Sequence, residues 1–337
     1  MNKYRFTLAY SAVITILTVI VFLLSCTSAA IPAPPSPPIT PPAVIVVEPP
    51  AQQAAFTIVA LPDTQKYSKS YPATFMAQTR WIKDNTAAKN IVFTVLLGDI
   101  TDSQHKKTEP VKQEWANAKN AMNLLEGLRY AALPGNHDNL IGGRIDNTFF
   151  NAAFPYTDFE NYSWYGGHYP QNGNQNSYSL VDVSGQNLLI MSIGYFGNTT
   201  EPMDEMMQLF NWANAVIAKY PDRNVIVATH SVLNSKGGFT NGGQMLWDYV
   251  IKRHANIFLV LAGHDCPEST VTKAGEAGNI VNILMSDYQC DEKGGNGYLR
   301  LMEFIPSQEI IHVETFSPLT GKLRAGSPRF NIPYSFK

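Results

Sequence analysis

Five short apolar segments each run directly into a polar cluster that contains Asp, Asn or His, and this recurrence constrains the fold more than any other feature of the chain. Their lengths are typical of buried strands, and they span residues 56–61, 91–97, 129–133, 224–229 and 256–262. Between the first three, apolar residues recur at spacings of three and four after Pro72 and after Pro110, which indicates helices. Alternating strands and helices predict an α/β sheet covered by helices.

The second half of the chain is richer in consecutive strand patterns than the first. A helix is expected at about 203–219, and further strands are expected at 177–183, 187–193, 279–285, 297–304 and 309–316. So many strands exceed what one sheet needs, and we therefore expect a second sheet packed on the first.

The first fifty residues differ in composition from the rest. After Arg5 no charged side chain appears until Glu48, although 15% of the whole chain is charged. The apolar run 6–24 is typical of the core of a secretory signal. It ends in Leu23-Leu24-Ser25-Cys26, which resembles the lipobox of bacterial lipoproteins, where the cysteine becomes the first mature residue and carries the lipid. An uncleaved anchor helix is the alternative, since about 18 apolar residues can just span a bilayer.

A proline-rich segment follows the signal. Nine of the 22 prolines fall between residues 32 and 50, and this predicts a semi-rigid stalk, because proline lacks an amide donor and fixes its own φ. The expected organisation is a lipoprotein signal peptide at 1–25, lipid-attachment Cys26 with a linker at 26–53, a globular domain at 54–320 and a C-terminal extension at 321–337. This order places the body outside the cytoplasm, tethered to a membrane at the cell surface or in the periplasm.

Composition excludes several classes of protein. The net charge of −2 and the lack of a basic stripe argue against a long nucleic acid as partner. A content of 45% hydrophobic residues argues against global disorder. The chain has no Gly-x-Ser-x-Gly elbow, no phosphate loop, and no Gly-x-Gly-x-x-Gly after a strand.

The polar clusters hold the candidate chemistry. Ligands in open α/β sheets collect outside the carboxyl ends of the strands, so we expect the clusters to converge. Carboxylate, amide oxygen and imidazole together suit Mn, Fe or Zn better than Ca. Any one cluster alone would be explained as a capped turn or a structural histidine. The clusters are Asp63-Thr64-Gln65, Gly98-Asp99-Ile100-Thr101-Asp102, Gly135-Asn136-His137-Asp138, His230 and Gly263-His264-Asp265-Cys266.

The ordered set resembles the calcineurin-like metallophosphoesterase superfamily, whose motifs run Asp-x-His, Gly-Asp-x-x-Asp, Gly-Asn-His-Asp/Glu, a lone His and Gly-His-x-His. The resemblance covers roughly residues 55–317. The phrases Leu-Pro-Asp-Thr-Gln at 61–65 and Ser-Asp-Tyr-Gln at 286–289 look like a bacterial branch with Gln in the first motif. The resemblance implies a four-layer α/β/β/α sandwich, with two packed mixed β-sheets flanked by helices, and makes 54–320 the catalytic domain.

The resemblance also implies two metal ions, of Mn, Fe or Zn. Asp99 would bridge both metals, and Asp63 would bind the first. The second metal would be bound by Asn136, His230 and His264. A hydroxide held between the two metals would attack phosphorus in a phosphate mono- or diester. A nucleotide, a phospholipid headgroup or a phosphorylated sugar would fit this chemistry.

Two further residues gain roles from the same resemblance. His137 would stabilise the transition state or protonate the leaving oxygen. Asp102 is expected to orient His137, as a carboxylate–imidazole pair would. Outside the motifs, Asp287 and Tyr288 follow an apolar strand, where they either shape the rim of a pocket or serve as turn residues.

This sequence departs from the family pattern at two positions, both at the first metal. Gln65 replaces the histidine of the first motif and would be a weaker amide-oxygen ligand. Cys266 replaces the second histidine of Gly-His-x-His. It is compatible with a disulfide to Cys290, with a thiolate ligand or with a buried thiol, and these alternatives stay open. The departures leave three functional hypotheses: a two-metal enzyme, a one-metal enzyme, and a surface-anchored binding protein that keeps the fold with reduced or no activity.

Overall fold

The computed structural model describes residues 54–103, 109–169 and 173–335. They belong to the second of two units of the chain, which spans Ala51–Lys337. The expected signal peptide, Cys26 and the proline-rich linker lie outside the described residues. Within the described ranges, no helix combines the length and the apolar character that crossing a membrane requires.

The first sheet has seven strands in the order β15-β14-β13-β1-β2-β3, with β16 also paired to β14. The strands β1, β2 and β3 run parallel, and β13 runs antiparallel to β1. Their bounds are β1 Phe56–Leu61, β2 Ile91–Leu96, β3 Tyr130–Ala132, β13 Leu299–Ile305, β14 Ile310–Ser317, β15 Lys322–Leu323 and β16 Phe330–Pro333.

The second sheet also has seven strands, in the order β11-β12-β10-β9-β8-β7-β6. Its central strands β12, β10, β9 and β8 are parallel, and the outer strands are antiparallel to their neighbours. The bounds are β6 Tyr165–His168, β7 Asn176–Val183, β8 Gln186–Ile193, β9 Asn224–Thr229, β10 Ile257–Ala262, β11 Glu268–Ala274 and β12 Ile280–Ser286.

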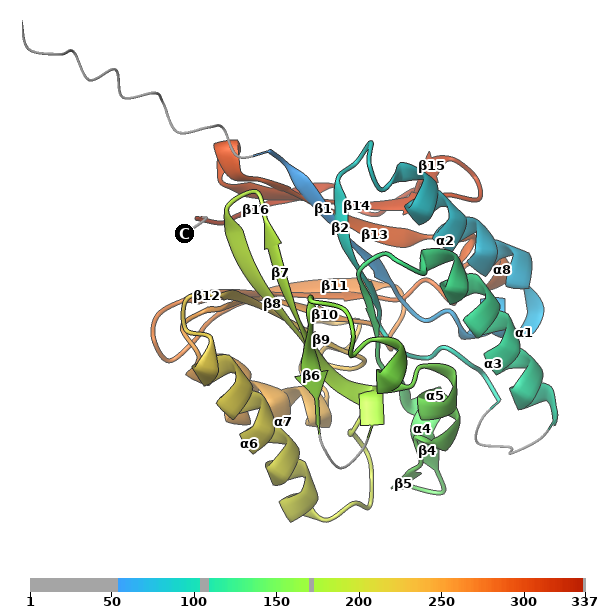
Figure 1. The fold of residues 1–337 in the computed structure, drawn as a ribbon, viewed down its shortest axis with the longest axis horizontal. Helices are drawn as coiled ribbons and strands as arrows, with labels where there is room; N and C mark the ends of the chain where they lie inside the picture. The colour runs from blue at the N-terminus through green and yellow to red at the C-terminus, as the bar shows by residue number, and fades with distance from the viewer. Residues whose placement is uncertain (1–53, 104–108, 170–172, 336–337) are drawn as a thin grey trace, which may run out of the picture. The chain divides into compact units, whose positions relative to one another are not determined.

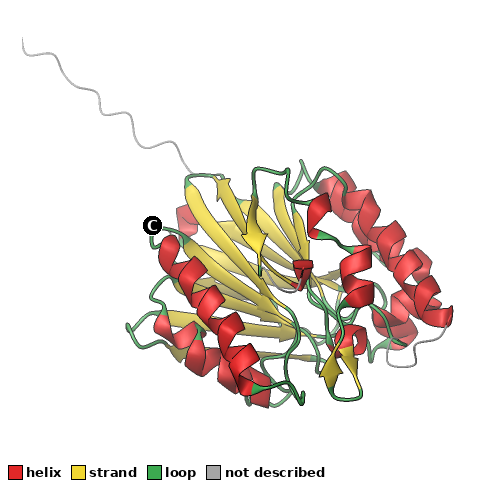
Figure 2. Ribbon diagram, turned by 60° about the horizontal axis from the view of Figure 1, so that its bottom comes forward, coloured by secondary structure: helices red, strands yellow, loops and turns green. Residues whose placement is uncertain are grey.

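Helices flank the two sheets on opposite sides (Figures 1 and 2). The helices α1, α2 and α3 lie beside the first sheet, and α6 and α7 lie beside the second. Smaller elements complete the described chain, including a hairpin of β4 and β5. The bounds are α1 Gln65–Ser70, α2 Pro72–Asn85, α3 Glu109–Met122, α4 Asn136–Asn139, β4 Leu140–Ile141, β5 Arg144–Ile145, α5 Thr148–Ala153, α6 Met203–Lys219, α7 Asn241–Tyr249 and α8 Glu292–Gly295.

Side chains that alternate along the strands of the second sheet hold the layers together. Leu188 and Ile190 of β8 belong to a buried cluster that also contains side chains of the first sheet. Leu189 and Met191, which point to the other face, join a cluster that contains Phe210 of α6. Because the side-chain period of a strand is two residues, one strand contributes to both cores. The expected four-layer sandwich is confirmed.

The C-terminal residues require one correction to the expected organisation. The segment 321–337 was expected to extend beyond the catalytic domain. In the structure β15 and β16 both pair with β14, with Ile332 opposite Ile311. The apolar side chain of Ile332 is buried in the core that the two sheets share. The last described residues are therefore part of the first sheet.

Candidate metal centre

The first sheet delivers three of the predicted clusters to one edge. Leu61 of β1 is the register partner of Leu96 of β2, which in turn pairs with Ala132 of β3. The three parallel strands therefore end at the same edge of the sheet. The loops that carry Asp63, Asp99 and Asn136 leave the sheet side by side.

The parallel strands of the second sheet also end at a common edge. Ala262 of β10 pairs with Met285 of β12, and Thr229 of β9 pairs with Ile193 of β8. The residues just beyond these strands include His264 and His230, which the sequence predicted. They also include Tyr195, which was not predicted, and Asp287, which was expected at a pocket rim or in a turn. The strand-end rule marks both positions, because each follows an apolar strand within two residues, but it does not distinguish a site residue from a turn residue.

Three candidate ligands lie in a backbone conformation that non-glycine residues rarely adopt. The φ angles are +46° for Asp63, +46° for Asp99 and +83° for His264. Such a residue typically costs about 1–3 kcal/mol and persists where the surrounding structure holds it. Each of these residues turns the chain sharply just after a strand. The strain therefore falls where side chains must be aimed at a common point.

Glycines make room for these side chains. A Cβ on Gly135 would lie 2.2 Å from Asp99 Oδ1, and a Cβ on Gly263 would lie 2.2 Å from Asp63 Oδ2. No real Cβ tolerates such a contact, so the glycines of the Gly-Asn-His-Asp and Gly-His clusters have a steric function. They let the backbone of one loop approach the carboxylate of another.

The residues predicted for the second metal lie together. Ligand atoms of Asp99, His230 and His264 all fall within 4.8 Å of one another. His230 Nε2 lies 3.0 Å from Asn136 Oδ1 and 3.2 Å from Asp99 Oδ1. His264 Nδ1 lies 3.1 Å from His230 Nε2. Four side chains from four strand ends thus meet at one point.

The protonation of His230 suits a metal ligand. Its Nδ1 lies 2.9 Å from the carbonyl oxygen of Leu97, which can only accept, so Nδ1 carries the proton and Nε2 presents a lone pair. Burial lowers the pKa of His230 to about 3, which keeps the ring neutral. The lone pair of Nε2 therefore lies beside two oxygens that carry lone pairs of their own, Asn136 Oδ1 and Asp99 Oδ1. A cation at this point would relieve the repulsion, so the residues fit a bound metal.

The residues predicted for the first metal are also buried. Asp63 is 1% exposed, and both its carboxylate oxygens lie 3.1 Å from the backbone amide of His264, which donates to them. Its pKa is raised well above the ordinary value, first by burial and then by the charges of Asp287 and Asp99. Gln65 begins α1 and donates from Nε2 to Gln289 Oε1 at 2.6 Å. Its Oε1 is buried and has no hydrogen-bond partner among the described residues, so it is free to coordinate.

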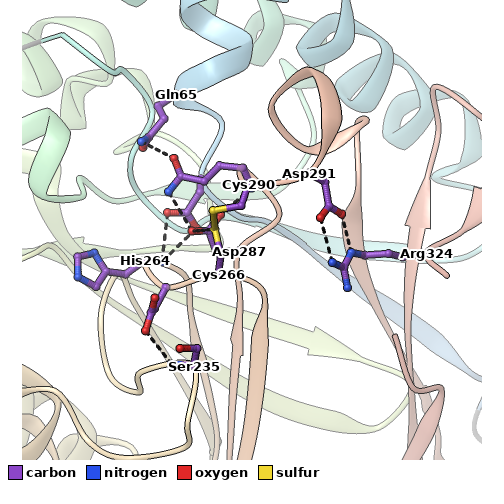
Figure 3. Close-up of a disulfide and its surroundings, with 11 residues drawn as sticks. Gln65, Ser235, His264, Cys266, Asp287, Cys290, Asp291 and Arg324 are labelled. Atoms are coloured by element: carbon purple, nitrogen blue, oxygen red, sulfur yellow. Dashed lines mark hydrogen bonds and ion pairs between the residues drawn. A yellow bond between two sulfur atoms is a disulfide. The ribbon is translucent and has the colours of Figure 1, made fainter. Parts of the chain in front are cut away.

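Cys266 forms a disulfide with Cys290 (Figure 3). Of the three alternatives for this residue, the structure therefore contains the disulfide, and Cys266 offers no thiolate to a metal. Its Sγ lies 3.2 Å from Asp287 Oδ2. A sulfur in a disulfide carries no proton, so this is a van der Waals contact.

Asp102 differs from the expectation. His137 Nδ1 lies 3.2 Å from the backbone carbonyl of Asp102, whereas the Asp102 carboxylate is 3.9 Å away. The carboxylate instead accepts from Lys66 Nζ at 2.7 Å and from Lys69. Against the effect of burial, these two lysines lower the pKa of Asp102 to about 2. The two side chains are therefore neighbours, as expected, but the lysines of α1 hold the carboxylate and the main-chain carbonyl of Asp102 lies closer to the ring.

Asp138 binds the backbone of the loops with its carboxylate. It is fully buried, and its carboxylate accepts from the backbone amides of Ile100, Thr101 and Gly135 at 2.8–3.0 Å. These bonds tie the loop after β2 to the loop after β3. Burial, followed by the charge of Asp99, raises the pKa of Asp138 to about 7.

A cavity of about 750 Å³ borders the centre. Tyr195 lines it, and the Tyr195 ring lies 5.8 Å from the ring of His230 and 6.0 Å from that of His264, measured between centroids. Two buried amides also line it. Both amide atoms of Gln175 and the Oδ1 of Asn139 have no hydrogen-bond partner among the described residues. Unpaired buried amides are costly, so they are expected to pair with something that enters the cavity.

Comparison with known proteins identifies a family. The family model described as Calcineurin-like phosphoesterase matches residues 56–268. An uncharacterized Bacillus subtilis protein, YvnB, is 34% identical over 280 residues, which is 80% of this chain. The chain spans only 20% of that relative.

Solved structures share the fold at low sequence identity. A dimetal phosphatase from Danio rerio has a TM-score of 0.55 at 11% identity, covering 83% of this chain and 99% of its own. The purple acid phosphatase PPD1 from yellow lupin has a TM-score of 0.52 at 11% identity, covering 84% and 55%. GAP50, described as the anchor in the inner membrane complex of Plasmodium, has a TM-score of 0.52 at 12% identity, covering 84% and 89%.

Proposed function

The chain belongs to the calcineurin-like phosphoesterase family, and on this premise we propose that it hydrolyses phosphate mono- or diesters with two bound metal ions of Mn, Fe or Zn. The observation that carries the proposal is the meeting of Asp99, His230 and His264 within 4.8 Å, with Asn136 beside them. Bound metals would supply a nucleophile at neutral pH and charge to stabilise the phosphoryl oxygens. Asp63, Gln65 and Asp99 would hold the first metal.

His137 would act on the substrate from the same edge. Its backbone amide donates to Asp99 Oδ1 at 2.9 Å, which fixes the residue beside the proposed bridging carboxylate. Its Nδ1 points to the carbonyl of Asp102, so Nε2 is the atom that would exchange a proton with the ester. The ring is partly exposed, with 33% of the side chain accessible, so a substrate can reach it. We propose that His137 protonates the leaving oxygen.

The cavity beside Tyr195 would hold the organic group of the ester. Its buried amides offer both donors and acceptors, and Tyr195 and Phe196 offer aromatic faces. Three carboxylates against one guanidinium make its rim net acidic: Asp146, Glu201 and Glu205 against Arg144. A second anionic group would be repelled there. We therefore propose a neutral, ring-bearing polar group, of the kind that nucleosides and sugars contain, as the occupant.

Hydrolysis of chromogenic mono- and diesters after addition of Mn or Zn tests the proposed reaction. We expect turnover that a chelator abolishes and that Asp99→Asn removes. No turnover with any of the metals, from a folded protein, would instead favour the binding protein that keeps this fold. GAP50, which is described as an anchor, shares this fold, and the binding alternative is therefore retained.

The occupant of the cavity is tested with Gln175→Met, which keeps the length of the side chain but removes its amide. We expect KM for nucleoside and hexose monophosphates to rise, because an amide that pairs with the substrate is lost. The rate with phenyl phosphate, whose ring carries no hydrogen-bonding group, should not change. A KM that stays the same for every natural ester would contradict the assignment.

We further propose that the protein is a membrane-anchored lipoprotein, lipidated at Cys26. The support is the uncharged apolar run that ends in Leu-Leu-Ser-Cys and the proline-rich stalk after it. Cys26→Ala should abolish labelling by a radioactive fatty acid and leave the precursor unprocessed. Labelling that persists in this variant would exclude Cys26 as the attachment point.

A further inference from the structure

We propose that Asp287 is a ligand of the first metal, replacing the imidazole that the family motif would place at Cys266. The inference rests on the metal pair of the proposed function but not on turnover. With the disulfide formed, the predicted first site retains Asp63, Asp99 and Gln65. This set has one donor fewer than the motif would supply, and Asp287 Oδ2 lies 3.2 Å from Sγ of Cys266, the residue at the motif position of the missing donor.

The topology brings Asp287 to the centre. It follows β12 directly, and β12 runs parallel to β10, the strand that leads to His264 and Cys266. The backbone amide of Asp287 donates to the carbonyl of Pro267 at 2.8 Å. The two loops therefore leave the sheet together, and Figure 3 shows Asp287 between His264 and the disulfide.

The Asp287 carboxylate is held but not neutralised. Its Oδ1 accepts from the Gln289 amide at 2.8 Å, and its Oδ2 accepts from Gln289 Nε2 at 2.9 Å. A carboxylate has about four lone-pair sites, so capacity for a metal remains. The side chain is fully buried, and in the described part of the chain no Lys or Arg forms an ion pair with it. Cys266 Sγ packs against Oδ2 and limits its movement.

The neighbouring charges are also unbalanced. Asp63, Asp99 and Asp287 are all buried, and the loop after β10 contacts two of them: its His264 amide donates to Asp63, and its Cys266 Sγ lies 3.2 Å from Asp287 Oδ2. Three buried carboxylates without a cation would repel one another at a high cost in free energy. A divalent cation among them would remove this cost.

Gln65 supplies a second, independent indication of a ligand. Its Nε2 donates to Gln289 Oε1, and the same Gln289 holds Asp287, so one residue positions both side chains. The Oε1 of Gln65 is left buried and unpaired among the described residues. The first site then consists only of oxygen donors: Asp63, Asp99, Asp287 and Gln65. Oxygen donors suit Mn²⁺ better than Zn²⁺, whereas the imidazoles of the second site suit Zn²⁺ or Fe.

The test is the metal content of the full chain after equilibration with Mn²⁺ and desalting, together with a calorimetric titration. We expect two bound equivalents in the wild type and one in Asp287→Asn, with the remaining affinity unchanged. The matched control is Asp265→Asn. Asp265 is also next to the site in sequence, but its carboxylate accepts from the Ser235 amide at 2.7 Å, so this variant should keep two equivalents.

Each outcome decides between the proposals. Two equivalents of unchanged affinity in Asp287→Asn, or a single equivalent in both wild type and variant, would overturn the assignment of Asp287. A wild type that binds two equivalents but hydrolyses no ester would contradict the proposed function and leave this inference standing. If Asp287→Asn fails to fold, Asp287→Glu decides. It keeps the carboxylate on a longer arm, so Mn²⁺ affinity should change at one site only, and unchanged affinity at both sites would overturn the inference.

Discussion

At the scale of single residues, an unusual backbone conformation directs the side chains of three proposed ligands. Asp63, Asp99 and His264 have positive φ angles, and glycines clear the space in front of the two carboxylates. His137 is different, because its ring is partly exposed and its Nδ1 is bound to a main-chain oxygen. This contrast separates residues that would hold metal from one that would meet substrate.

His137→Ala tests this separation. We expect kcat to fall by about 10²–10⁴-fold, the usual contribution of a proton-transfer residue, while the metal content stays the same. Steady-state kinetics and elemental analysis of the same preparation would measure both. The bound carboxylate of Asp102 makes Asp102→Asn a useful control. Because the carbonyl of residue 102 orients the ring, this variant should retain most of the activity. Loss of metal from His137→Ala would show that His137 is a ligand.

The residues also mark the limits of prediction from the sequence. The residues of the second site follow strands whose apolar runs are continuous, so strand ends and convergence could be predicted. Asp287 could not be distinguished from a turn residue, because its burial depends on β12 lying beside β10. The state of Cys266 stayed open for a similar reason. Whether two cysteines meet depends on the path of the loop between them.

At the scale of elements, prediction succeeded where the apolar pattern was strong. The helix expected at 203–219 is α6, whose buried face is spaced by threes and fours. Several elements had no strong apolar pattern, and two of them show the reason. The strand β11 is a polar edge strand with no fully buried residue, and α1 has only six residues. Edge strands and single helical turns depend on tertiary contacts and leave little trace in the sequence.

The effect of the disulfide on stability can be separated from its effect on metal binding. Cys266 and Cys290 are 24 residues apart, and closing a loop of this size stabilises a protein by roughly 3 kcal/mol. We expect the double variant Cys266→Ser, Cys290→Ser to unfold at lower denaturant concentration. We also expect it to bind the first Mn²⁺ more weakly, because Asp287 loses its packing against sulfur. A loss of stability with both Mn²⁺ affinities intact would show that the disulfide only staples the loop.

At the scale of the whole molecule, the two sheets create the site and also an imbalance of charge. Burial raises the pKa of four carboxyl groups of the metal-free protein: Asp63, Asp99, Asp138 and Asp287. The value is about 6 for Asp287 and about 7 for Asp138. Burial lowers the pKa of His230 to about 3 and of His264 to about 4, the latter helped by the charge of His230. The native state thus favours neutral forms of both kinds of group.

These shifts have opposite effects on stability. A carboxyl with a raised pKa binds its proton more tightly when folded, so its contribution is present below the unfolded value of 3.8 and is lost as pH rises towards 7. A histidine with a lowered pKa contributes stability above 6.5 that is lost as pH falls towards 3–4. His168 and His254 also have a lowered pKa, so four imidazoles oppose the four carboxyls. The part of the stability that the buried carboxyls contribute to the metal-free protein should nevertheless fall as pH rises from 3.8 to 7.

Metal reverses this dependence, because it binds the carboxylates in their ionised form and no longer leaves their charges unpaired. We expect the difference in Tm between the Mn²⁺-loaded and the chelator-treated protein to widen as pH rises from 5 to 7.5. Scanning calorimetry of both forms in buffers of equal ionic strength would measure it. The variant Asp287→Asn removes one raised carboxyl and one proposed ligand, so its difference in Tm should widen less. A difference that stays constant or narrows with pH would mean that the buried carboxylates are not what the metal compensates, and the assignment of the whole centre would have to be revised.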